Sequence, residues 1–130
     1  MKVLLIRVNH IIVCGIVGYV GNREAQPILF DCLSKLEYRG YDSCGIAICG
    51  SQIKGYKDAV RVETLRQNAP FLHGTIGIGH TRWATHGPPS LHNAHPHFDC
   101  SGKIAIVHNG IVDNYQTLRD LLNAEGHTFV

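Results

Sequence analysis

Three short polar segments hold the residues whose types and spacing are best suited to chemistry. They read EYRGYDSCG at 37–45, HTRWATHG at 80–87 and HNG at 108–110. Each segment ends or follows an apolar run typical of a strand, and functional side chains often gather on loops at strand ends. Polar groups packed this densely beside strands either satisfy one another or await a ligand. The residue types alone leave both interpretations open.

Cys14 stands between an apolar run and a glycine-containing run, within HIIVCGIVGYVG. It could be a lipid-anchored cysteine after a signal peptide, a buried strand thiol, or a nucleophile at the start of a chain. The first interpretation fails because Arg7, Asn9 and His10 interrupt the apolar run and bulky Val13 precedes the cysteine. No segment approaches the ~18 uninterrupted apolar residues of a membrane span. The other two interpretations remain open.

Five histidines lie within eighteen residues, and neutral imidazoles bind zinc. They are His80, His86, His92, His95 and His97. No HExxH motif or cysteine partner accompanies them, and the spacing of the last three matches no standard set of zinc ligands. We therefore expect loop histidines held by hydrogen bonds rather than a metal site, and we expect no cofactor.

Composition excludes several classes of partner. The 130 residues are 45% hydrophobic and 17% charged, which predicts one soluble globular domain. A net charge of +2 without a Lys/Arg cluster argues against nucleic acid and anionic membranes as partners. The five cysteines are irregularly spaced and form no CxxC pair, so they indicate neither a disulfide framework nor a cysteine zinc site. Reduced thiols predict a cytoplasmic protein.

The first third of the chain predicts a strand and then a helix. Residues 14–20 are β-branched and apolar, which favours a buried strand. Apolar residues then recur at three- and four-residue steps from Ala25 to Leu36, with Asn22 as the expected cap and Gly40 as the expected stop.

The remaining elements follow from the same periodicities. We expect a strand hairpin over 44–60, a short helix ended by Pro70, a strand opening GTIGIGHTRWATHG, a buried strand over 103–110 and a helix over 114–125. The chain contains no repeat, linker or low-complexity segment.

Five motifs carry a family resemblance. In chain order, CGIVGYVG, LEYRGYDSCGIAI, HTRWATHGPPS, NAHPH and VHNGIVDNY resemble the N-terminal glutaminase domain of the glucosamine-6-phosphate synthases, the isomerising glutamine:fructose-6-phosphate aminotransferases. The resemblance covers residues 14–130. CGIVG alone is shared by other class II glutamine amidotransferases, whereas EYRGYDS together with HTRWATHG points to the hexosamine enzymes.

The resemblance implies an α+β fold, the four-layer αββα sandwich of the N-terminal nucleophile hydrolases, incomplete in this chain. Cys14 would be both nucleophile and base, because the α-amine of a first residue has a pKa of about 7.7–8.0 and can accept the thiol proton. Asn109, through its side-chain amide, and Gly110, through its backbone N–H, would stabilise the oxyanion. Without the resemblance, Asn-Gly after a strand would be interpreted as a simple turn.

The same resemblance assigns the substrate contacts. Arg82 would clamp the carboxylate of glutamine, a task suited to the fork of a guanidinium. Thr85 and His86 would be neighbouring substrate contacts, and Trp83 would border the path by which ammonia leaves. Arg39 would support the site. For Trp83, a plain core aromatic is an equally good interpretation.

Two departures from the family pattern qualify the resemblance. Residues 1–13 precede Cys14, so we expect either a misassigned start, with Val13 encoded by an initiating GUG codon, or a propeptide removed by self-cleavage. Residues 14–130 would be the first part of the glutaminase domain, inactive by itself. Fructose 6-phosphate would be reached only through sugar domains absent here, and the full-length relatives are expected to be homo-oligomers. An inactive fragment or interaction module of the same family is the alternative.

Overall fold

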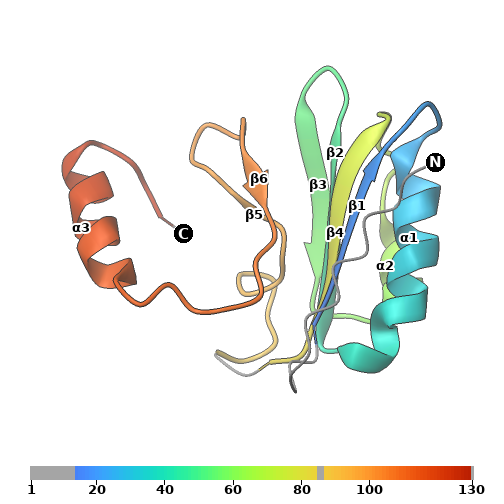
Figure 1. Cartoon of the computed structure of the whole chain (residues 1–130), viewed down its shortest axis with the longest axis horizontal. Coiled ribbons are helices and arrows are strands. Elements are labelled where there is room, and N and C mark those ends of the chain that lie inside the picture. The colour runs from blue at the N-terminus through green and yellow to red at the C-terminus, as the bar shows by residue number, and fades with distance from the viewer. Residues whose placement is uncertain (1–13, 85–86, 130) are drawn as a thin grey trace.

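The computed structural model describes residues 14–84 and 87–129, and its elements form four layers (Figure 1). Helices α1 (Ala25–Leu36) and α2 (Val62–Asn68) cover one face of a four-stranded sheet. A two-stranded sheet lies on its other side, and helix α3 (Tyr115–Ala124) is outermost. This order of layers confirms the expected αββα architecture. None of the described helices is both long and apolar enough to span a membrane.

The larger sheet is antiparallel with the strand order β1-β4-β2-β3. Its strands are β1 (Gly15–Val20), β2 (Ser43–Cys49), β3 (Ile53–Asp58) and β4 (Ile76–Arg82). The hairpin β2–β3 is the one expected from the sequence, whereas β4 returns to lie between β1 and β2. The ends of β1 and β4 therefore meet where Gly15 pairs with Thr81, directly after Cys14 and before the HTRWATHG loop.

Helix α1 packs closely onto the sheet because glycines lie beneath it. Leu29 and Leu33 are fully buried. A Cβ built on Gly77 would lie 2.8 Å from Leu29 Cδ1, and one built on Gly79 would lie 3.0 Å from Leu33 Cδ1. Glycine at positions 77 and 79 therefore leaves the space that the two leucine side chains fill.

The start of α1 differs from the expectation. Glu24, not Asn22, occupies the N-cap position, and it makes no side-chain cap hydrogen bond. Its carboxylate instead accepts the backbone N–H of Gly74 at 2.9 Å and lies 3.2 Å from His73 Nδ1. These contacts hold the pKa of Glu24 below its ordinary value, mainly through the Gly74 hydrogen bond. A tertiary contact has replaced the local cap.

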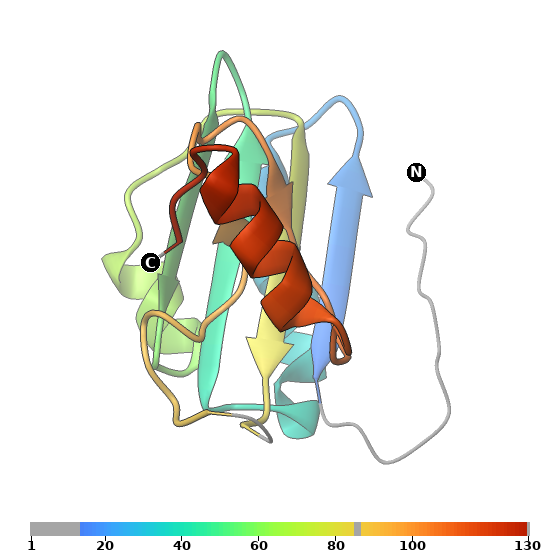
Figure 2. The same cartoon turned by 90° about the vertical axis from the view of Figure 1, so that its left-hand side faces the viewer.

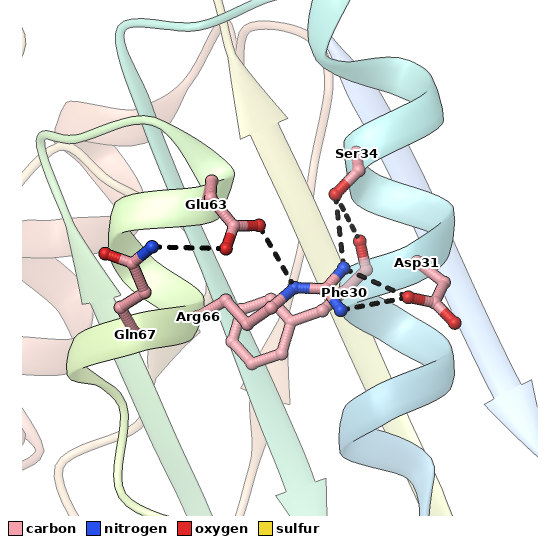
Figure 3. Close-up of polar contacts among 6 residues, drawn as sticks. All are labelled: Phe30, Asp31, Ser34, Glu63, Arg66 and Gln67. Carbon is pink, nitrogen blue, oxygen red and sulfur yellow. Dashed lines mark hydrogen bonds and ion pairs between the residues drawn. The ribbon is translucent and has the colours of Figure 1, made fainter.

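Arg66 attaches α2 to α1 (Figure 3). Both terminal guanidinium nitrogens lie 3.0 Å from Asp31 Oδ1, and one also donates to Ser34 Oγ. The guanidinium lies 5.5 Å from the centre of the Phe30 ring. On its own helix, Arg66 Nε lies 3.5 Å from Glu63. The side chain thus covers the apolar contact between the two helices.

The second sheet is smaller than the sequence suggests. It consists of β5 (His97–Phe98) paired with β6 (Ala105–Ile106). The expected buried strand over 103–110 is therefore wrong in length and burial, since Ile104 and Ile106 are exposed. Asp99 shapes the connecting turn by accepting the backbone N–H groups of Lys103 and Ile104.

Helix α3 matches the expected range, and none of its residues is buried. It crosses the strands obliquely in the rotated view (Figure 2). Its apolar residues Tyr115, Leu118 and Leu121 are exposed. The periodicity of the apolar residues correctly predicted the helix, because that pattern depends on helical geometry rather than on what covers the apolar face.

Candidate active site

Cys14 lies at the edge of the larger sheet, immediately before the first residue pair of β1. The following residue, Gly15, donates its backbone N–H to Thr81 Oγ1 at 3.2 Å. The Cys14 thiol contacts the backbone of Trp83: Trp83 N–H donates to Sγ at 3.3 Å, and Sγ lies 3.8 Å from the Trp83 carbonyl oxygen. Cys14 as a residue is half-buried.

The segment EYRGYDS fixes the loop that follows β4. Asp42 donates its backbone N–H to the Arg82 carbonyl at 3.1 Å and accepts the backbone N–H of Ala84 at 2.8 Å. The rings of Tyr41 and Trp83 lie nearly perpendicular, with their centroids 5.1 Å apart. These contacts join two of the three polar segments and hold the Trp83 backbone against Cys14.

The HNG segment brings its asparagine to the same place. Asn109 Nδ2 lies 3.5 Å from the Cys14 carbonyl oxygen, and Asn109 Oδ1 lies 2.7 Å from His80 Nε2. Gly110 has φ +152°, a conformation that favours glycine, and a Cβ there would lie 3.0 Å from the His108 ring. Residues 95 positions apart in the chain thus meet, and the meeting involves two of the three predicted catalytic residues.

Arg82 is 8% exposed at the end of β4. Its guanidinium donates to the carbonyl oxygens of Gly87 at 3.2 Å and Pro88 at 3.4 Å. The two contacts connect the end of β4 to residues 87 and 88. Thr85 and His86, the predicted neighbouring substrate contacts, lie outside the described residues.

Arg39 ends the short 3₁₀ helix Glu37–Arg39. Its Nε donates to Tyr38 Oη at 3.1 Å, and its guanidinium lies 5.7 Å from the centre of the same ring. The contacts described for Arg39 are with Tyr38 and not with Cys14. Its supporting role therefore stays a prediction.

Three histidines form a stack beside the site. His80 stacks on His95 at 4.3 Å between ring centroids, and His97 meets the edge of His95 at the same distance. Burial lowers the pKa of His80 to about 4 and that of His95 to about 3, and burial also lowers the pKa of His97. At neutral pH the stack is therefore uncharged. The described residues contain no group of three or more His, Cys, Asp or Glu side chains arranged to hold a metal ion.

Sequence reasoning missed three residues that organise the site. Thr81 joins the ends of β1 and β4, Asp42 holds the loop after β4, and His80 contacts Asn109. Asp42 and Thr81 lie within the motifs EYRGYDS and HTRWATHG, which marked both residues as candidates for the site. Their partners could not be predicted, because these depend on the pairing of β4 with both β1 and β2.

Solved structures define the class of protein. Glutamine phosphoribosylpyrophosphate amidotransferase from B. subtilis superposes with a TM-score of 0.72 at 27% identity, over 88% of this chain and 26% of its own. A structure described as the allosteric regulatory enzyme of purine biosynthesis gives a TM-score of 0.74 at 29% identity, with the same coverages. The chain has the fold of the N-terminal nucleophile glutamine amidotransferases.

Curated relatives define the family within that class. The glutamine–fructose-6-phosphate aminotransferases (isomerizing) of Clostridium tetani and Methanococcus maripaludis are 56% and 53% identical over 120 and 118 residues. The matches cover 90% and 89% of this chain and 20% of each relative. No protein-family model matches the chain. The chain belongs to the glutamine–fructose-6-phosphate aminotransferase family and spans about a fifth of the length of these relatives.

Proposed function

We propose that this chain is the nucleophile-bearing part of a glutaminase, which releases ammonia from glutamine for transfer to fructose 6-phosphate. The observation that carries the proposal is the meeting of the Cys14 thiol with the Trp83 backbone and of the Asn109 amide with Cys14. The names of the relatives supply the two substrates. Fructose 6-phosphate would bind sugar domains that lie outside this chain, in a homo-oligomer.

The proposed reaction begins with proton transfer from the Cys14 thiol to its own α-amine, directly or through a water. The thiolate attacks the side-chain amide carbon of glutamine and forms a C–S bond. The C–N bond then breaks, and the amine returns its proton to the departing ammonia. Water hydrolyses the γ-glutamyl thioester, which yields glutamate and restores the thiol. No cofactor takes part in this sequence.

Asn109 and Gly110 would stabilise the negative oxygen of the tetrahedral intermediates. One such donor is worth about 3 kcal/mol in other hydrolases. The Asn109 amide nitrogen lies 3.5 Å from the Cys14 carbonyl oxygen, so a substrate carbonyl beside Sγ would be within reach of a small movement.

The remaining residues would bind and position the substrate. Arg82 would clamp the glutamine carboxylate, with Thr85 and His86 beside it. Trp83 would border the exit path of ammonia, and Arg39 would support the site. The five unpaired cysteines favour a reducing compartment, and we propose the cytoplasm.

A hybrid protein tests the proposal. Residues 14–130 replace the matching region of the Clostridium tetani relative, either directly after an initiator methionine or after residues 1–13. The first hybrid should lose its methionine and hydrolyse glutamine. The second should be inactive while residues 1–13 remain, because an amide nitrogen at Cys14 cannot accept the thiol proton.

Two controls make the comparison decisive. Mass analysis of the N-terminus must accompany each assay, since self-cleavage would expose Cys14. Cys14→Ala in the first hybrid should abolish thioester formation and labelling by a diazoketone analogue of glutamine while leaving the thermal transition unchanged. Full activity in protein shown to retain residues 1–13 would refute the mechanism. Inactivity of both folded hybrids would favour the inactive alternative.

A further inference from the structure

A short polar contact links the buried histidine stack to the proposed oxyanion site. His80 is 1% exposed on the central strand β4, and its Nε2 lies 2.7 Å from Asn109 Oδ1. We propose that His80 is a positioning residue, which fixes the rotation of the Asn109 amide so that its NH₂ group faces the reacting carbonyl beside Cys14. The catalytic part of this inference rests on the proposed glutaminase function.

The orientation of the amide matters because its two ends have opposite hydrogen-bonding roles. The NH₂ group donates, whereas the oxygen accepts and would repel a negative oxyanion. With Oδ1 towards His80, Nδ2 faces the Cys14 carbonyl oxygen at 3.5 Å. Rotation by half a turn would put two acceptors against each other at Cys14. The network therefore assigns the amide orientation and requires a hydrogen on His80 Nε2.

The ring of His80 is held so that it can act as a fixed donor. Residue 80 pairs with Ile16 on one side and Gly45 on the other. His95 stacks on the ring, and His95 Nδ1 accepts the backbone N–H of His108 at 3.4 Å. The neighbour of Asn109 in sequence is thus attached to the same stack. His95 therefore braces the His80–Asn109 contact from both ends.

The protonation of the ring agrees with this role. His80 Nδ1 is buried and has no hydrogen-bond partner in the described part of the chain, so it needs no proton. Burial, with a smaller contribution from the neighbouring Arg82 guanidinium, lowers the pKa of His80, while its bond to Asn109 opposes the shift. The ring is therefore neutral at physiological pH with its hydrogen on Nε2, and its donor role is constant there.

Loss of this donor should affect turnover more than binding. Removal of an oxyanion donor lowers kcat by roughly 10²–10³-fold. An amide that can rotate is still able to donate part of the time, so His80→Leu should cost less, about tenfold in kcat, with KM changed less than about twofold. A purely structural role for His80 would not produce that split.

The kinetic test uses the active hybrid with its N-terminal Cys14. His80→Gln should recover most of the lost kcat, since the glutamine amide can place a donor near the position of Nε2. Asn109→Ala removes the amide that His80 orients. Adding His80→Leu to Asn109→Ala should therefore lower kcat no further. His97→Leu, the same change elsewhere in the histidine stack, is the matched control and should leave kcat unchanged. Additive effects of His80→Leu and Asn109→Ala would overturn the proposal.

A spectroscopic test uses the 130-residue chain itself and does not depend on glutaminase activity. Long-range ¹H–¹⁵N correlation should show His80 as the neutral Nε2–H tautomer at pH 7, and Asn109→Ala should shift its Nε2 resonance, whereas His97→Leu should not. An Nδ1–H tautomer, or a His80 resonance indifferent to Asn109→Ala, would overturn the proposal. Inactivity of the hybrid would instead refute the proposed function and leave this result standing.

Discussion

The packing of Leu33 on Gly79 makes a quantitative prediction about coupling between helix α1 and strand β4. Leu33 is fully buried, so it cannot retreat into solvent. A Cβ on Gly79 would lie 3.0 Å, 3.3 Å and 3.4 Å from the Cδ1, Cγ and Cδ2 atoms of Leu33. Contacts this short require one residue to give way by a few tenths of an ångström.

Each substitution alone should destabilise the fold. Leu33→Ala should lower the free energy of unfolding by about 3–4 kcal/mol, the usual range for a buried leucine. Gly79→Ala should lower it by about 1–2 kcal/mol, because overpacking costs about 1–3 kcal/mol and the restricted unfolded chain returns about 0.4–1 kcal/mol.

Together the two substitutions should compensate. With Leu33 shortened to alanine, the new methyl group enters the vacated space and gains about 0.8 kcal/mol of burial in addition to the unfolded-state term. Gly79→Ala should then stabilise the protein by about 1–2 kcal/mol. The coupling free energy should therefore be about 2–4 kcal/mol.

Urea unfolding of the parent chain, the two single variants and the double variant, followed by circular dichroism, measures this coupling. Gly18→Ala on β1 is the matched control, since a Cβ there meets nothing within 4 Å. It should raise the free energy of unfolding by about 0.4–1 kcal/mol both in the parent chain and in the Leu33→Ala variant. Additivity of Leu33→Ala and Gly79→Ala to within about 0.5 kcal/mol would refute the close packing.

Three further predictions concern pH, the α1–α2 contact and thiol reactivity. Because folding lowers the pKa of His80 to about 4, the unfolded chain binds its proton first, and stability should fall as pH drops from about 6.5 to 4. The contribution of His80 to the slope of the free energy of unfolding against pH should reach roughly 1.4 kcal/mol per pH unit. Urea unfolding at several pH values measures this slope, and an equal slope in the parent chain and in His80→Gln would contradict the prediction. Arg66→Met should lower the free energy of unfolding by about 0.5–1 kcal/mol, and Arg66→Ala should lower it by more because the apolar stem is also lost. Equal shifts of the melting temperature in the two variants would show that the stem does not pack against the α1–α2 contact. Site-resolved mass spectrometry should find rapid alkylation of exposed Cys49 and Cys100 and very slow alkylation of Cys44, whose pKa burial raises to about 12; equal rates would show that the sheet opens readily.

Local periodicity predicted the elements that depend on local geometry. The range of α1 and the β2–β3 hairpin follow from apolar spacing and a tight turn. The cap of α1 did not follow, because Glu24 is held by Gly74, fifty residues away. The insertion of β4 between β1 and β2 was equally invisible, since residues close in sequence do not make those pairs.

The candidate site shows the same division. Strand ends and motif resemblance identified Cys14 and Asn109, which the structure brings together. They did not identify His80 as the partner of Asn109, because that contact spans 29 residues and depends on two separate sheets. The strand expected over 103–110 was predicted from an apolar pattern. Such a pattern does not determine how many residues pair with a neighbouring strand, and in this described segment only Ala105 and Ile106 do so.

The location of Cys14 ahead of the first β1 pair separates folding from chemical competence. The ladder begins with Gly15 opposite Thr81, so its hydrogen bonds are the same whether the nitrogen of Cys14 is a free amine or part of a peptide bond. Processed and unprocessed molecules should therefore share the fold of residues 14–129, melt together and co-purify. Activity per milligram would then depend on the fraction of chains with a free N-terminal cysteine. A value of kcat can be calculated only after that fraction has been measured.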